Sequence, residues 1–156
     1  TRSYSVTGVQ TCALPIFRKA VELDINVIYD LICDLEGAKM DFEAFSKIYS
    51  LNLSSSDIVY LAAEYNGNVV GFLSIHIQHI LHHSKPTCEL QELNVFDEFR
   101  SLHVGTELMQ EAERIAKDLG LEEIELTTKV FRKRAQEFYT RLGYENTHLK
   151  FLKKLS

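Results

Sequence analysis

The chain of 156 residues is poor in the features that mark secreted, membrane-spanning and nucleic-acid-binding proteins. It has only three cysteines, Cys12, Cys33 and Cys88, whose spacing fits neither a paired disulfide framework nor a zinc motif. No apolar run approaches the roughly 20 residues that cross a bilayer. The formal net charge of -5 argues against a general nucleic-acid binder, which usually carries a basic face. We therefore expect a cytoplasmic protein without a nucleic-acid or membrane partner.

Repeats, linkers and low-complexity segments are also missing, and the length fits a single domain. The start of the chain stands apart, because residues 6–16 resemble the translation of a common DNA-sequencing adapter. We expect residues 1–16 to be a non-native leader and residues 17–156 to form one domain, with a stub of its first strand at 16–20. A genuine N-terminal arm is the alternative.

Four segments repeat apolar residues at helical spacing and carry helix boundary signals. The first ends at Gly37, the second follows the capping residue Asp41, and the third and fourth end at Gly120 and Gly143. We expect helices over residues 21–36, 41–51, 103–119 and 133–142.

Runs of strand-forming residues occupy the segments between these helices. Asn66-Gly67 is a strong hairpin signal, so the two runs that flank it are expected to pair antiparallel. A strand before and a strand after the third helix predict a parallel pair, and hence an α/β domain with a mixed sheet. The expected strands cover residues 58–65, 69–80, 87–95 and 123–128, with one or two closing strands in the tail, 144–155.

The loop before the third helix has the properties of an anion site. It begins with the basic Arg100 and has Gly105 where the helix starts, so amides without intrahelical acceptors can point at an anion. This geometry suits the pyrophosphate of a nucleotide-derived cofactor. His103 in this loop is expected to crowd that group or to adopt a left-handed backbone, which His tolerates better than most residues.

Polar side chains gather on two neighbouring strands. Glu89 and Gln91 are expected on one face of their strand, with Glu92 on the other, and His76 and Gln78 share a face of the preceding strand. A carboxylate can accept the proton that an ammonium group loses, directly or through water, so Glu89 is our candidate base. His76 and Gln78 are candidates for substrate contact. An exposed strand glutamate and solvated histidines are the alternatives.

Four of the six histidines fall within residues 76–83, and imidazole suits Zn, Ni, Cu or Fe. Their spacing matches no closed zinc motif. The metal therefore stays unknown, with Glu89 and His76 as candidate ligands.

Two motifs resemble those of the GCN5-related N-acetyltransferase (GNAT) family. Residues 100–105 resemble its cofactor loop, Gln/Arg-x-x-Gly-x-Gly/Ala, with His103 in place of the first glycine. Residues 135–144 resemble its Ala-x-x-Phe-Tyr-x-x-x-Gly-Phe/Tyr block, and Arg132 stands where many members carry Asn. The resemblance extends from Phe17 to Leu155.

The resemblance implies a single-domain GNAT fold, in which a central, mixed, splayed sheet is flanked by four helices. Acetyl-CoA would lie where the strand segments 89–95 and 123–128 diverge, and its acetyl group would pass directly to an amine. Tyr139 would protonate the departing thiolate, whose basicity is similar to that of a phenol; an aromatic core residue is the alternative. The implied cofactor-binding residues are Leu93, Asn94, Val95, Arg100, Leu102, His103, Val104, Gly105, Thr106 and Arg132.

Shorter segments, among them residues 31–35, 76–78, 81–83 and 89–93, are similar to the bacterial aminoalkylphosphonate N-acetyltransferase branch. That likeness implies a small amine bearing a phosphonate as acceptor, a divalent metal ion as a possible cofactor and a possible homodimer. Polyamines, aminoglycosides and protein N-termini are alternative acceptors. A non-catalytic acyl-CoA-binding module and a histidine-based metal-storage protein are alternatives from other classes.

Overall fold

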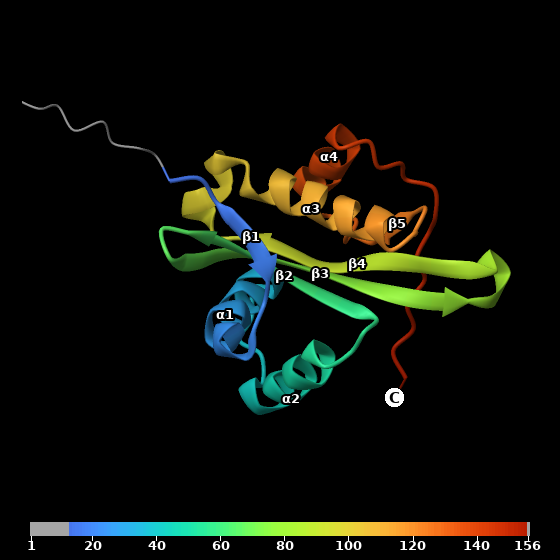
Figure 1. Ribbon diagram of the computed structural model, residues 1–156. Coiled ribbons are helices and arrows are strands. Elements are labelled where there is room, and N and C mark those ends of the chain that lie inside the picture. The colour runs from blue at the N-terminus through green and yellow to red at the C-terminus, as the bar shows by residue number, and fades with distance from the viewer. Residues whose placement is uncertain (1–12, 156) are drawn as a thin grey trace, which may run out of the picture.

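The computed structural model describes residues 13–155 and places a five-stranded sheet between two layers of helices (Figure 1). The strands lie in the order β1-β2-β3-β4-β5. Helices α1 and α2 cover one face, and α3 and α4 cover the other (Figure 1). The α-helices and strands are β1 (Ile16–Lys19), α1 (Ile25–Glu36), α2 (Phe42–Leu53), β2 (Ile58–Tyr65), β3 (Asn68–Ile80), β4 (Lys85–Val95), α3 (Val104–Asp118), β5 (Ile124–Leu126) and α4 (Lys133–Arg141). Short 3-10 helices span η1 (Glu22–Asp24), η2 (Leu81–His83) and η3 (Asp97–Leu102).

The predicted mixed sheet is confirmed. Strands β1 to β4 pair antiparallel and β5 pairs parallel to β4. Asn66 and Gly67 form the predicted hairpin turn, both with positive φ, 50° and 79°. The strand stub forms β1, in which Ile16 pairs with Glu64. Residues 1–12 of the expected leader lie outside the described residues.

All four predicted helices are present. The Asp41 carboxylate accepts a hydrogen bond of 2.7 Å from the Ala44 amide, as expected of the capping residue of α2. The predicted first turn of α1 is the 3-10 helix η1 instead. Within residues 13–155, no helix is both long and apolar enough to span a bilayer.

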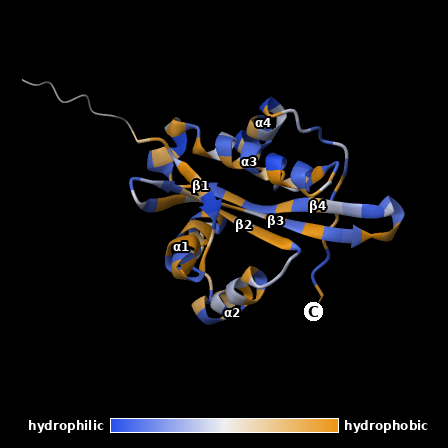
Figure 2. Cartoon of the chain, in the orientation of Figure 1, coloured by the Kyte–Doolittle hydropathy of each residue, from blue (hydrophilic) through white to orange (hydrophobic). Residues whose placement is uncertain are grey.

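The main core lies between α3 and the sheet. Leu73 and Ile75 of β3 are fully buried there, against Leu108 and Met109 of α3. A Cβ on Gly71 would lie only 3.2 Å from the Leu108 side chain, so this glycine allows α3 to approach closely. Hydrophobic residues accordingly follow the central strands in Figure 2.

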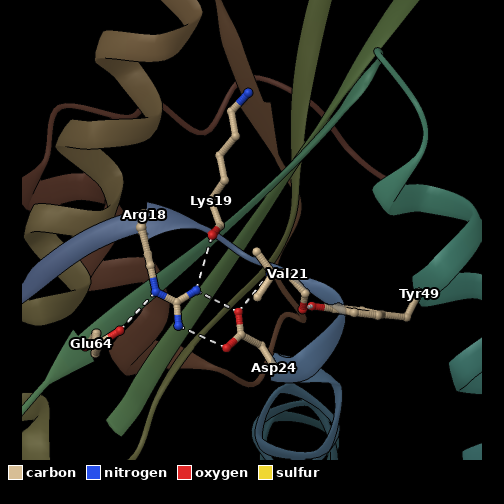
Figure 3. A network of polar contacts seen from close by, with 6 residues as sticks. All are labelled: Arg18, Lys19, Val21, Asp24, Tyr49 and Glu64. Atoms are coloured by element: carbon tan, nitrogen blue, oxygen red, sulfur yellow. Dashed lines mark hydrogen bonds and ion pairs between the residues drawn. The ribbon is translucent and has the colours of Figure 1, made fainter. Parts of the chain in front are cut away.

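An ion-pair network links β1 to its neighbour β2 and to the start of α1 (Figure 3). Arg18 donates two hydrogen bonds to the Asp24 carboxylate, at 2.7 and 3.0 Å, and one of 3.0 Å to Glu64. Tyr49 of α2 donates to the Val21 carbonyl at 2.8 Å, which links the second helix to the same point. The Arg18 guanidinium lowers the pKa of Asp24, although burial opposes the shift.

The prediction of one or two closing strands in the tail was wrong. Residues 144–155 contain no strand, and Phe151 and Leu155 are exposed. Strand β5 is shorter than expected and pairs with β4 only from Cys88 to Leu90. An alternating pattern becomes a strand only where a partner edge supplies backbone hydrogen bonds, and the tail finds none within residues 13–155.

Candidate functional site

The predicted anion loop has amides available at the start of α3. The first intrahelical amide is that of Glu107, which donates to the His103 carbonyl at 3.1 Å. The amides of Val104, Gly105 and Thr106 have no backbone or side-chain acceptor among residues 13–155. His103 takes the predicted left-handed conformation, with φ of 59°. This loop can therefore bind an anion without the glycine that the family motif carries at position 103.

Arg100 does not extend freely from this loop. Its guanidinium donates to the Val95 carbonyl at 2.9 Å and to the Asn94 side chain at 3.3 Å, and it pairs with Asp97. Asn94 in turn donates to the Leu31 carbonyl of α1 at 2.9 Å. Arg100 and Asn94 thus tie the loop to the end of β4 and to α1. Leu102 closes η3 beside them and is exposed.

Helix α4 brings the second motif next to the amide loop. A Cβ on Gly105 would lie 3.6 Å from the Phe138 ring and 3.9 Å from Val95, so α4, β4 and α3 meet there. Tyr139 is half-buried, with its ring 5.3 Å from that of Phe138. Burial raises the pKa of the Tyr139 phenol, and the Arg132 cation partly offsets this, so the phenol carries its proton at neutral pH.

Arg132 has a partner that the sequence did not indicate. It donates to the Leu35 carbonyl at the end of α1 at 2.6 Å and lies 3.6 Å from Glu36. Lys129 makes an ion pair of 3.0 Å with the same Glu36. The segment before α4 is thus fixed to the end of α1, and both cations are engaged by the protein itself.

The end of β4 leaves an open edge beside this loop. The ladder with β5 stops at Leu90, whereas β4 continues to Val95 and stays paired with β3 on its other side. The strand backbone around Leu93 and Val95 is therefore unpaired on the side of β5, within the described chain. This matches the divergence expected of a splayed sheet.

A β-bulge corrects the expected arrangement of the polar face. Ser74 pairs with Glu92 while Ile75 pairs with Leu90, so Gln91 is the extra residue. Glu92 therefore lies on the same face as Glu89, whereas strict alternation had placed it opposite. The buried Ser74 hydroxyl donates to the Glu92 carboxylate, and the Glu92 amide donates back to it at 3.2 Å.

Glu89 pairs with His76 across β3 and β4, and its carboxylate accepts a hydrogen bond of 3.2 Å from Gln78. The structure thus places the candidate base beside both candidate substrate contacts. Sequence reasoning missed Glu92 and Ser74. The signal was present: the apolar residues Cys88, Leu90, Leu93 and Val95 are spaced by two, three and two positions, and the middle step breaks strand periodicity.

The histidines of residues 76–83 do not converge on one point. His79 lies 3.8 Å from an acidic residue just before β2, and His83 lies 3.9 Å from one on β5. Within residues 13–155, no group of three His, Cys, Asp or Glu side chains is placed to hold a metal ion. Glu89 and His76 alone do not make the donor set of such a site.

A cavity of about 550 Å³ lies between α1, α2 and the polar face of the sheet. His76, Gln91 and Glu92 border it from the sheet, and its other walls are mostly aromatic and aliphatic. The cavity and the open edge thus both lie along β4, and the amide loop follows the end of this strand after η3. A small molecule can therefore lie against one face of β4 and an anionic group beyond its end.

Comparison with known proteins agrees with this arrangement. A model of the acetyltransferase (GNAT) family matches residues 26–144. The chain is 38% identical over 138 residues to the aminoalkylphosphonate N-acetyltransferase of Salmonella typhimurium strain LT2, covering 88% of this chain and 90% of that protein.

Two solved structures with 18% identity share the fold. One is a transcriptional regulator from Bacillus halodurans, with a TM-score of 0.82 over 90% of this chain and 99% of that one. The other is glucosamine-6-phosphate N-acetyltransferase from Arabidopsis thaliana, with a TM-score of 0.77 over 92% of this chain and 100% of that one. The chain belongs to the acetyltransferase (GNAT) family, which uses acetyl-CoA, and is an N-acetyltransferase.

Proposed function

We propose that this N-acetyltransferase acetylates the primary amine of a small molecule, and that this molecule is an aminoalkylphosphonate. The free amides of Val104, Gly105 and Thr106, next to the open edge of β4 and to Phe138, carry the donor part of the proposal. The likeness to the Salmonella enzyme over most of both chains supports the acceptor part.

The amides at the start of α3 bind the pyrophosphate of acetyl-CoA, because the helix N-terminus is partly positive. The pantetheine arm follows the open edge of β4 from Leu93 to Val95, where a strand amide can polarise the thioester carbonyl. Arg100, Asn94 and Arg132 hold this frame to α1 through the contacts described above.

The transfer is direct. The Glu89 carboxylate first accepts a proton from the ammonium group. The resulting amine nitrogen attacks the thioester carbon, a new C–N bond forms as the C–S bond breaks, and the second N–H proton passes to solvent. The departing thiolate takes the proton of Tyr139. Burial raises the pKa of this phenol, so Tyr139 still carries its proton when the thiolate forms. His76 and Gln78 lie beside Glu89 and contact the acceptor.

Thiol release from acetyl-CoA tests the proposal, with aminomethylphosphonate and spermidine as competing acceptors. We expect release with the phosphonate and little with spermidine. Glu89→Gln and Tyr139→Phe each lower kcat by about 100-fold or more, the usual effect of a proton-transfer group, while CoA affinity is kept.

Two matched controls accompany these variants. Tyr144→Phe removes a hydroxyl near Tyr139 that is bonded to Glu113, and Glu43→Gln removes an exposed carboxylate of α2. Both controls keep wild-type turnover. Near-normal turnover of Glu89→Gln and Tyr139→Phe would contradict their assignment, and no release with any amine would contradict the proposed function.

A further inference from the structure

The cavity on the α1 and α2 side is larger than the simplest acceptor needs. Its volume of about 550 Å³ lies within the roughly 300–1,000 Å³ of sites that enclose whole small-molecule ligands. Aminomethylphosphonate has a single carbon atom and would leave most of this space empty. The size of the cavity therefore calls for a larger group.

The walls of the cavity are suited to an apolar group. Phe45 and Tyr49 of α2 stack with ring centroids 6.0 Å apart, and Tyr49 stacks on Tyr60 of β2 at 5.4 Å. Phe72 of β3 and Tyr60 pack in an edge-to-face arrangement, with ring centroids 5.2 Å apart. At the rim, Ile48 keeps 58% of its surface exposed. Tyr49 and Phe72 are almost fully buried, so the half-buried Phe45 and Tyr60 and the exposed Ile48 supply most of the apolar surface that borders the cavity. This surface favours an aryl or branched alkyl substituent.

The charges that border the cavity have one sign. Asp41 and Glu92 contribute carboxylates, and no lysine or arginine is among the lining residues within the described chain. Glu92 is held by the buried Ser74 hydroxyl, which fixes its carboxylate at the sheet end of the cavity. An ammonium group is stabilised there, whereas a phosphonate would be desolvated next to two carboxylates without a cation.

We propose that the acceptor is a primary amine with an aryl or branched alkyl substituent, that this substituent fills the cavity, and that Glu92 holds the ammonium group before it reacts. This inference rests on the proposed function and specifies its acceptor. The phosphonate of an aminoalkylphosphonate then lies outside the cavity, and Glu92 binds while Glu89 accepts the proton.

A series of 1-substituted aminomethylphosphonates tests the size of the substituent. The series carries hydrogen, methyl or benzyl at the amine-bearing carbon, and phenethylamine serves as the matching amine without phosphonate. We expect kcat/KM to rise about tenfold or more from hydrogen to benzyl, the scale that a filled apolar pocket provides. Phenethylamine is also acetylated.

The outcomes separate the two proposals. Turnover of aminomethylphosphonate together with a kcat/KM that falls from the hydrogen to the benzyl compound would overturn this inference and leave the proposed function intact. No thiol release with any member of the series would overturn both. Turnover of phenethylamine but of none of the phosphonates would support the cavity assignment and remove the phosphonate from the proposed function.

Variants of the cavity sharpen the test. Ala44→Phe adds a ring at the wall, and we expect it to lower kcat/KM for the benzyl compound about tenfold and to lower that for aminomethylphosphonate much less. Lys47→Phe places the same ring on an exposed position of α2 that does not line the cavity, and it changes neither value.

Glu92→Gln distinguishes ammonium binding from proton transfer. We expect it to raise KM for phenethylamine about tenfold, the value of a lost charged hydrogen bond, with kcat kept. Glu89→Gln lowers kcat instead. Loss of kcat without a change of KM in Glu92→Gln, or equal effects of Ala44→Phe on both phosphonates, would overturn the inference.

Discussion

The two faces of the sheet differ in what they contribute. The face under α3 is aliphatic and sealed, with Leu73, Ile75 and Leu108 fully buried. The face under α1 and α2 carries polar residues such as Ser74, His76 and Glu92, and encloses a cavity. The sealed face holds α3 rigidly, so that its amides are presented at a fixed place. The open face leaves room for an acceptor, at the expense of buried apolar area.

The largest effect is expected from truncation on the sealed face. Leu108→Ala leaves a hole among fully buried neighbours, so we expect the free energy of unfolding in urea to fall by about 3 kcal/mol or more. Ile48→Ala on the open face removes a side chain that is already exposed, and it costs less than about 1 kcal/mol. Equal losses of unfolding free energy in the two variants would contradict the proposed difference between the faces.

Acid should loosen the open face first, because its helices are attached partly by an ion pair. Arg18 lowers the pKa of Asp24 in the folded state, so the ion pair stabilises the protein above the pKa of an unfolded Asp, about 4, and this contribution is lost as the pH falls through the lowered value. We expect a loss of about 1 to 2 kcal/mol, discounted for the partly exposed Arg18.

Hydrogen exchange, corrected for its intrinsic pH dependence, measures where this loss appears. Below pH 4, amides of α1 should lose protection before those of α3. In Asp24→Asn, the difference between the two helices should already be present at pH 7. Loss of protection in α3 first would contradict the account of how the helices are attached.

A smaller contrast concerns the space available for an added group. Gly71→Ala brings a methyl group within 3.1 to 3.3 Å of Val95, Val104 and Leu108, so we expect a loss of about 1 kcal/mol in the free energy of unfolding. Ala44→Phe adds a whole ring at the cavity and changes stability by less than about 0.5 kcal/mol. Thermal unfolding of both variants measures the difference. A Gly71→Ala protein as stable as the wild type would mean that α3 can move away from the sheet.

Local signals predicted most of the fold. The turn at Asn66-Gly67, the cap at Asp41 and the left-handed His103 each depend on a few neighbouring residues, and all are confirmed. The bulge at Gln91 depends on the pairing of two strands. Because of it, Glu92 lies on the same face as Glu89, whereas strict alternation predicts the opposite face. The tail had the pattern of a strand without a partner edge.

The position of several candidate site residues was predicted, whereas their roles stay predictions. Sequence motifs placed the amide loop and Tyr139, because both belong to helix boundaries with regular spacing. The guanidinium group of Arg132 was not placed, because its partners Leu35 and Glu36 come from α1, more than ninety residues away in the chain. The hydrogen-bond partners of Arg100 lie within six residues of it, at the end of β4, but they depend on how the chain turns after that strand. The cavity was not predicted either, since it depends on how α2 sits over the sheet.

Binding of acetyl-CoA, measured by calorimetry, tests most directly the claim that the first amides of α3 hold the cofactor. Thr106→Pro removes one of these amides at a position in the first helical turn where proline is tolerated, and Thr106→Ala keeps it. The account predicts that the wild-type protein and Thr106→Ala bind acetyl-CoA with similar affinity, and that Thr106→Pro, still folded by thermal unfolding, binds about tenfold or more weakly. A wild-type protein that binds neither CoA nor acetyl-CoA, or equal affinity in all three proteins, would contradict it.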